Sequence, residues 1–344
     1  MADPIFKRLE FHLVYACPQA CVFCSEEDRM AAFKDQPVSL REAAEVLALK
    51  RREGFDHVTF TGGEPTLYPR FAELLRYSKR IGFRTYVTTN GNTLGPAPFA
   101  HKTLPWLDEL CFSVHGPNRE IHDGATGDRG SFGLLKRALE TVETMPYRPY
   151  VLANFVVTPV NVGALADTLR FVSRFKKVRH FLVSNLASEG GGKHHYRDLA
   201  VPLKRIAREA PALIRLARTS GITLRFFGVP TCILGPGNEE YANDFQWSPR
   251  ATIERKRDAD GHVGLVEIRG WTPTRGRIQT DKCGNCVYNR LCPGLFERYY
   301  REFGDAELSP VMTGSVAAGL GRGMALRSDE ETNFWPQGAP AWPG

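Results

Sequence analysis

The stretch EFHLVYACPQACVFC, residues 10–24, decides how this chain folds. Its first half, EFHLVYA (10–16), alternates apolar and polar residues and is typical of a β-strand. Its second half places Cys17, Cys21 and Cys24 within eight positions of one another. A strand that runs directly into such a loop predicts a metal-binding segment at the end of that strand.

Strand-like and helical patterns alternate from this stretch to about residue 190. The expected strands cover 10–16, 57–63, 84–91, 108–116, 149–158 and 178–185. The expected helices begin at Ser39 and cover 70–82, 131–145 and 162–174. Such alternation predicts an α/β fold with a parallel sheet, a partial (β/α)6 TIM-like barrel. The polar strand exits TGGEP, TTNG, SVHG and TPVN would then converge on one rim.

Composition narrows the class of protein. The 344 residues, 42% of them hydrophobic, are enough for a substantial core, and no signal peptide or membrane-spanning stretch is present. We therefore expect a cytoplasmic protein with no membrane partner, whose eight cysteines are reduced and available for metal or redox chemistry. The net charge of +7 is scattered over many helix faces, which favours a solvated surface over a nucleic-acid partner.

The pattern changes beyond residue 190. A glycine-rich turn, a long basic helix over 199–219 and a hairpin around 262–280 precede a second cysteine group, and the end of the chain is rich in Gly, Ala and Pro. We expect three parts: a barrel over 1–190, a C-terminal extension over 191–309 and a flexible tail over 310–344.

Three clustered cysteines suit an iron-sulfur cluster better than zinc. A cubane cluster has four irons, so three thiolates leave one iron open to an outside ligand. A structural zinc site would need a fourth nearby Cys or His, and none is close in sequence to Cys24.

At this point the sequence resembles the radical S-adenosylmethionine (radical SAM) superfamily. The resemblance rests on CPQACVFC (17–24), on GGEP (62–65), and on HDGATGDRGSF (122–132), which is similar to a stretch of the MoaA-like branch. It implies that a [4Fe-4S] cluster on Cys17, Cys21 and Cys24 binds S-adenosylmethionine through its open iron. The cofactor-binding positions that match the family are Phe23, Gly62, Gly63, Glu64, Thr89, Asn90, Ser113 and Asn154.

The resemblance also implies an activity. A reducing partner such as flavodoxin or ferredoxin would supply an electron, S-adenosylmethionine would be cleaved to a 5′-deoxyadenosyl radical, and that radical would take hydrogen from a substrate. His115 departs from the Asp that relatives often carry there, so its role stays open, and no catalytic side chain is assigned.

Most of these positions have a plainer alternative. Gly62 and Gly63 could form a simple strand-exit turn, while Ser113 and Asn154 could be satisfied buried polar residues and Phe23 part of the core. The cysteine loop upstream favours the binding interpretation. Cys111, between Leu110 and Phe112, is expected to be a small buried residue and not a ligand.

The second cysteine group has the spacing C-x2-C-x5-C. Cys283, Cys286 and Cys292, with Cys232 as the fourth thiolate, resemble the twitch or SPASM-type extensions that hold auxiliary [4Fe-4S] clusters. A full SPASM pattern would carry another cysteine soon after Cys292, where 293–296 reads PGLF, so one auxiliary cluster is expected. A zinc ribbon is the alternative that spacing leaves open.

We therefore expect an enzyme that abstracts hydrogen from a small biosynthetic substrate and uses the auxiliary cluster for electron transfer in an oxidation or bond-forming step. The first alternative is a radical SAM maturase that modifies a ribosomally made peptide, although only about ten residues precede the first strand and no peptide-binding domain is evident. The second alternative is a non-catalytic electron carrier or a zinc-binding protein.

Overall fold

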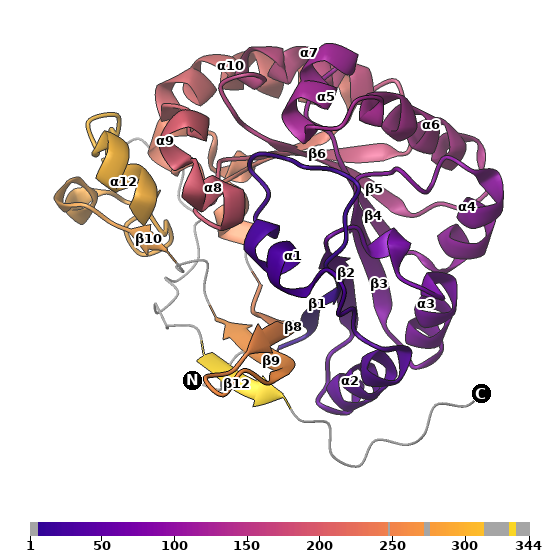
Figure 1. The fold of residues 1–344 in the computed structure, drawn as a ribbon. Coiled ribbons are helices and arrows are strands. Elements are labelled where there is room, and N and C mark those ends of the chain that lie inside the picture. Colours follow the sequence, from indigo (N-terminus) through magenta and orange to yellow (C-terminus); the bar gives the residue numbers. More distant parts are fainter. Residues whose placement is uncertain (1–5, 247, 272–275, 313–329, 335–344) are drawn as a thin grey trace.

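The structure is a computed structural model that describes residues 6–246, 248–271, 276–312 and 330–334. A ten-stranded sheet in the order β12-β9-β8-β1-β2-β3-β4-β5-β6-β7 forms its centre. The sheet curves, and helices cover its outer side (Figure 1).

Eight neighbouring strands of this sheet are parallel. They are β1 (Arg8–Val14), β2 (His57–Gly62), β3 (Arg84–Thr89), β4 (Glu109–Ser113), β5 (Tyr150–Val156), β6 (Val178–Ser184), β7 (Thr223–Phe227) and β8 (Arg250–Arg257). The α/β class and the first six strands are confirmed. The sheet is larger than six units, because β7 continues it beyond β6 and β8 pairs with β1.

The helices between the strands follow the apolar pattern of the sequence. The long ones are α2 (Leu40–Arg52), α3 (Phe71–Arg80), α6 (Ser131–Thr144), α7 (Leu165–Val172) and α10 (Leu203–Ser220). The short ones are α1 (Glu27–Phe33), α4 (Ala97–Thr103), α5 (Arg119–Thr126), α8 (Gly190–His194), α9 (Tyr196–Leu199), α11 (Thr231–Leu234) and α12 (Glu297–Phe303). Ser39 and Glu42 form the capping box expected at the start of α2. None of the described helices is long and apolar enough to cross a bilayer.

The sequence predicted a hairpin around 262–280, which is too late in the chain. The structure pairs β8 with β9 (Val263–Gly270), so the turn lies at 258–262. The turn has the sequence DADGH, and its Asp and Gly residues favour turns. The Asp258 carboxylate accepts hydrogen bonds from the backbone N–H groups of Asp260 and His262. β12 (Glu330–Phe334) pairs antiparallel with β9 at the edge of the sheet.

The second cysteine group lies in a small unit beside the sheet. β10 (Arg277–Ile278) pairs with β11 (Leu295–Phe296), and α12 follows (Figure 1). This unit docks on α10, because the Glu307 carboxylate and the Tyr299 hydroxyl accept hydrogen bonds from the backbone N–H of Leu203 at the helix start.

The boundaries expected at 190 and 309 stay predictions. β7 and β8 belong to the same sheet as the barrel strands although they follow residue 190. Most of the tail expected over 310–344 lies outside the described residues, which there comprise 310–312 and the backbone of β12.

The two faces of the sheet differ in chemistry. Along β1, Leu9, Phe11 and Leu13 are buried on the helix side, and Phe60, Phe112 and Phe155 of neighbouring strands are also fully buried. Burial of each such side chain contributes about 1.5–3 kcal/mol. Glu10 and His12 alternate with these residues and so face the concave side.

Candidate active site and second cysteine site

One cavity of about 250 Å3 opens at the carboxyl ends of β1 to β5. All three cysteines of the first group line it. So do all eight of the cofactor-binding residues expected from the sequence: Phe23, Gly62, Gly63, Glu64, Thr89, Asn90, Ser113 and Asn154. Residues from five separate strand exits therefore meet around one space.

The cysteine loop is held by short backbone contacts. The N–H of Cys24 donates to the carbonyl oxygen of Cys21 at 3.0 Å, and the side-chain amide of Asn90 lies 3.6 Å from Cys17 Sγ. Burial raises the pKa of the Cys17 thiol to about 11 and also raises that of Cys21. These thiols therefore need a bound cationic group to become thiolates.

Gln19 is a cavity residue that the sequence did not single out. It is buried, and its side-chain NH2 has no hydrogen-bond partner among the described residues. A buried donor without a partner is costly, which fits a cavity built to hold a polar ligand. The donor set of three cysteines and this amide thus fits an iron-sulfur cluster with a polar ligand beside it.

Gly62 and Gly63 let two chain segments touch. A Cβ atom on Gly62 would lie 2.2 Å from the Val14 carbonyl oxygen, and one on Gly63 would lie 2.3 Å from that of Ala16. The N–H of Gly63 donates to Val14 at 2.7 Å, so the exit of β2 supports the entry to the cysteine loop.

Glu64 joins the exits of two strands. Its buried carboxylate accepts hydrogen bonds from the backbone N–H groups of Thr66 and Asn90 and from the hydroxyls of Thr66 and Thr89. Burial raises its pKa despite these four donors. Glu64 therefore braces the loops after β2 and β3 as well as lining the cavity.

The far wall comes from β4 and β5. Ser113 and Asn154 are paired across the two strands, and the Ser184 hydroxyl donates to Asn154 Oδ1 at 2.7 Å, which orients that amide. His115 packs edge-on against Phe23 with ring centres 4.8 Å apart. Burial lowers the pKa of His115 to about 3, so it is neutral and supports Phe23 as part of the wall. Cys111 is buried and lines neither cysteine cavity.

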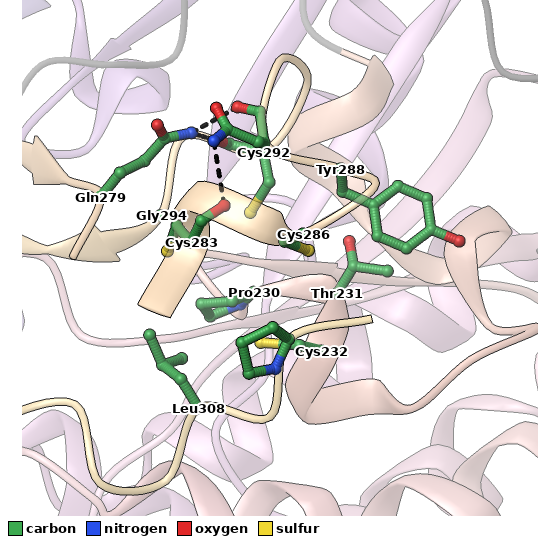
Figure 2. Close-up of a pocket in the computed structure, with 12 residues that line it drawn as sticks. Pro230, Thr231, Cys232, Gln279, Cys283, Cys286, Tyr288, Cys292, Gly294 and Leu308 are labelled. Atoms are coloured by element: carbon green, nitrogen blue, oxygen red, sulfur yellow. Dashed lines mark hydrogen bonds between the residues drawn. The ribbon is translucent and has the colours of Figure 1, made fainter. Parts of the chain in front are cut away.

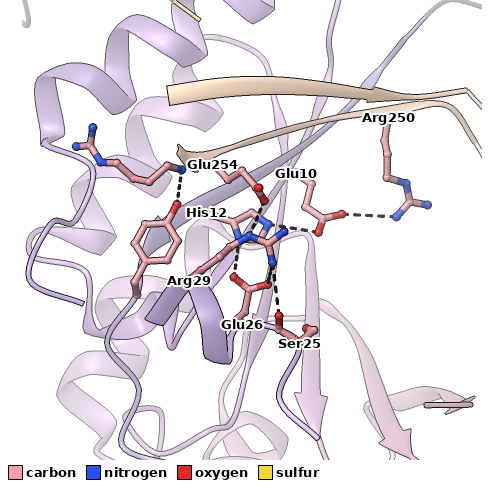
Figure 3. Close-up of polar contacts among 9 residues, drawn as sticks. Glu10, His12, Ser25, Glu26, Arg29, Arg250 and Glu254 are labelled. Atoms are coloured by element: carbon pink, nitrogen blue, oxygen red, sulfur yellow. Dashed lines mark hydrogen bonds and ion pairs between the residues drawn. The ribbon is translucent and has the colours of Figure 1, made fainter. Parts of the chain in front are cut away.

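A charged cluster forms the floor of the cavity (Figure 3). His12 Nδ1 lies 2.9 Å from Glu26 and Nε2 lies 3.7 Å from Glu10, and both carboxylates line the cavity. Burial alone would lower the pKa of His12, but the two carboxylates raise it to about 10. Burial would raise the pKa of Glu10, but His12 and Arg250 lower it to about 2. The floor therefore carries an imidazolium between two carboxylates.

This cluster also anchors the cysteine loop. Arg29 of α1 pairs with Glu26 at 3.1 Å and with Glu254 of β8 at 2.9 Å (Figure 3). The segment after Cys24 is thus tied both to the cavity floor and to the C-terminal hairpin. The alternation of Glu10 and His12 within the apolar strand 10–16 is the signal that could have identified this floor.

The glycines of 190–192 form a second anchor. The N–H of Gly191 donates to the Cys24 carbonyl oxygen at 2.9 Å, and a Cβ on Gly191 would lie 2.4 Å from that of Val22. His194 Nε2 lies 2.6 Å from Asp28 of α1. The helix α8 therefore packs directly on the cysteine loop, a role that its sequence did not reveal.

A second cavity collects the remaining predicted ligands (Figure 2). Cys232, Cys283, Cys286 and Cys292 all line it. Burial raises the pKa of Cys232 to about 11 and of Cys292 to about 12. The Thr231 hydroxyl also lines this cavity, is buried and has no partner among the described residues.

The spacing of the sulfur atoms bears on the choice between zinc and an iron-sulfur cluster. A tetrahedral zinc with bonds of 2.3 Å brings its sulfur ligands to about 3.8 Å from one another. Among the described residues, no three cysteine sulfurs lie within 4.8 Å of one another in either group. As placed in this structure, the sulfurs of each set are more widely spaced than the ligands of one bound zinc ion.

Comparison with known proteins agrees with this geometry. Residues 12–172 match the Radical SAM superfamily, a range that includes the end of β1, all of β2 to β5 and every residue of the first cysteine loop. Residues 12–172 therefore form a Radical SAM domain. The family implies S-adenosylmethionine and a [4Fe-4S] cluster, and both groups fit the donor set of the first cavity.

Proteins similar to this chain carry names that describe different activities. The mycofactocin maturase MftC of Mycobacterium ulcerans is 28% identical over 193 residues, 56% of this chain and 50% of the relative. The AdoMet-dependent heme synthase of Nitratidesulfovibrio vulgaris is 22% identical over 339 residues, 88% of this chain and 90% of the relative. The chain spans about half the length of the maturases it matches.

A solved structure shares the fold. SuiB of Streptococcus suis, bound to the precursor peptide SuiA, matches with a TM-score of 0.50 and 18% identity, covering 66% of this chain and 49% of SuiB. This similarity supports the barrel architecture of the residues aligned.

Proposed function

We propose that this protein is a radical SAM enzyme that acts on a small polar biosynthetic substrate and uses an auxiliary [4Fe-4S] cluster. The observation that carries the proposal is the first cavity, where three cysteines and eight expected cofactor residues from five strand exits line one space. A reducing partner such as flavodoxin or ferredoxin would supply the electron.

The residues of the first cavity divide the work. Cys17, Cys21 and Cys24 would hold the cluster, and Ser113 and Asn154 on the far wall of the cavity would bind polar parts of S-adenosylmethionine. When bound, the cluster and S-adenosylmethionine together supply a 5′-deoxyadenosyl radical that removes a hydrogen atom from the substrate. The buried walls keep water away from this reaction.

The floor points to a polar substrate. Glu10, Thr61 and Thr88 line both the first cavity and a neighbouring one of about 160 Å3, so the two cavities adjoin. The adjoining cavity also presents Thr59 and the Tyr86 ring, and its charged groups are Glu10, Arg8 and Arg250. Hydroxyls and paired charges on rigid strands suit a small molecule rich in hydrogen-bonding groups.

The second cavity supports the auxiliary cluster. Four cysteines would occupy every iron of a cubane, which suits electron transfer better than direct substrate binding. The spacing of their sulfur atoms favours this cluster over a zinc ribbon.

Anaerobic reconstitution tests the proposal. The protein should bind about eight irons and release 5′-deoxyadenosine when S-adenosylmethionine and dithionite are added. Exchanging Cys17, Cys21 and Cys24 for Ala should abolish that release and remove half of the iron. Cys111 lies outside both cavities, so Cys111→Ala is the matched control and should behave as wild type.

Other results would point to the alternatives. An intact cluster with neither 5′-deoxyadenosine nor a spectral change on addition of S-adenosylmethionine would make the protein an electron carrier. About four irons with one zinc would remove the auxiliary cluster and leave the first.

Peptide maturation is the second candidate function, favoured by the similarity to a maturase and to a peptide-bound structure. Ultrafiltration can distinguish the two candidate functions. An extract of the source cells is passed through a membrane that retains peptides, and the filtrate and the retained fraction are each added to the enzyme. Small-molecule chemistry requires that the filtrate increases 5′-deoxyadenosine release. Stimulation found only in the retained, protease-sensitive fraction would establish the peptide candidate instead.

A further inference from the structure

Arg277 is buried where the parallel sheet meets the second cavity. Its side chain is 2% exposed. Its guanidinium carbon lies 3.7 Å from the centre of the Phe296 ring and 5.4 Å from that of Phe227, the last residue of β7. Contacts with two aromatic rings fix the position of this positive charge.

Asp244 provides the opposite charge. The Asp244 side chain is 5% exposed, and its carboxylate lies 3.4 Å from Arg277 Nη2. Burial raises the pKa of Asp244 and lowers that of Arg277, so each depends on the other to remain charged. The pair therefore places two fixed, opposite charges inside the protein.

Both charges reach the second cysteine group. Arg277 Nη1 donates to the carbonyl oxygen of Gly294, which lines the second cavity two residues after Cys292. Asp244 is held at the same place by its ion pair with Arg277.

We propose that Arg277 and Asp244 set the reduction potential of the cluster held by Cys232, Cys283, Cys286 and Cys292. This inference rests on the auxiliary cluster of the proposed function. One-electron reduction adds one negative charge to the four-thiolate site, and the electron comes from an added reductant or from a substrate radical that is oxidised. Arg277 stabilises that extra charge and Asp244 opposes it, with little solvent between them.

Single and double substitutions separate the two charges. Arg277→Gln should make the midpoint potential of the auxiliary cluster more negative, and Asp244→Asn should make it more positive. Each change should alter the equilibrium for reduction at least tenfold, which is about 59 mV for one electron. The midpoint potentials of the double variant and of Arg277→Lys should lie between those of Arg277→Gln and Asp244→Asn.

The measurement is a redox titration of the full-length, anaerobically reconstituted protein, followed by electron paramagnetic resonance. The first cluster is an internal control in every sample, and its potential should not change. If the two single variants shift the auxiliary potential in the same direction, or leave it unchanged while the protein retains about eight irons, the inference is wrong.

A failure of the proposed function would be distinct, because the wild type would then hold about four irons and show no second signal. If Arg277→Gln does not load its cluster, Asp244→Asn decides the matter alone. A positive shift in that variant supports the inference, and its absence overturns it.

Discussion

The Nδ1 atom of His12 lies 2.9 Å from a carboxylate oxygen of Glu26, and this contact joins β1 to the segment directly after Cys24. Both side chains are largely buried, with 5% and 12% of their surface exposed. The cavity floor and the cysteine loop are therefore parts of one electrostatic unit, and loss of either charge should weaken both.

His12→Asn should lower the free energy of unfolding by about 1.5–3 kcal/mol at neutral pH, because it removes the imidazolium that pairs with both Glu26 and Glu10. Glu26 and Glu10 raise the folded-state pKa of His12 to about 10, against the effect of burial. This stabilisation is therefore complete below pH about 6.5, the ordinary pKa of histidine, and is lost as pH rises through about 10.

Urea unfolding of wild type and variant across this pH range measures the effect. The exposed His262 offers a control, and His262→Asn should change stability by less than about 0.5 kcal/mol. A loss in His12→Asn that is the same at both ends of the range would contradict the ion-pair explanation.

Gly191→Ala should displace the cysteine loop, because the new Cβ would lie 2.4 Å from the Val22 carbonyl oxygen. We expect a loss of about 1–3 kcal/mol in stability and reduced iron binding at the first site. Gly124→Ala is the matched control, since a Cβ there meets nothing within 4 Å and the residue lies inside α5. Equal iron content in the two variants would show that α8 does not position the loop.

Local patterns predicted the parts of the fold that depend on local forces. The capping box at Ser39 and the apolar periodicity of 71–80 predicted α2 and α3, because each signal lies within the element it forms. The sequence placed the hairpin too late because β8 carries five charged residues among its eight and looks less like a strand than β9 does. Its pairing with β1 supplies the partner that its composition did not indicate.

The candidate site could also be predicted only where local sequence patterns define it. The cysteine spacing and GGEP predicted which residues meet at the first cavity, since both motifs follow strands that the fold makes parallel. Gly191 and Arg29 could not be found in this way, because their contacts with Cys24, Glu26 and Glu254 come from segments far apart in the chain. Only the three-dimensional packing brings these anchors together.

Glu64→Gln should destabilise the protein even without S-adenosylmethionine. The carboxylate accepts four hydrogen bonds, and an amide would turn an N–H group toward one of those donors. The expected cost is about 1–3 kcal/mol, seen as a lower thermal midpoint. The exposed Glu140→Gln serves as control. If Glu64 acts only on the ligand, the ligand-free variant would unfold at the wild-type temperature.

Glu267→Ala should separate the C-terminal hairpin from the barrel. Glu267 of β9 lies 2.5 Å from Lys50 Nζ of α2, and these side chains are 5% and 1% exposed. Without Glu267, the buried Lys50 ammonium still pairs with Glu53 at 2.8 Å, so the loss should be about 1.5–3 kcal/mol. The paired change Glu267→Leu with Lys50→Met removes both charges at similar volume and should recover much of that loss. Hydrogen exchange of β8 and β9 measures the effect directly, and faster exchange in Glu267→Ala than in the double variant is the expected result. If the double variant exchanges as fast as the single one, the hairpin is held by packing and not by this ion pair.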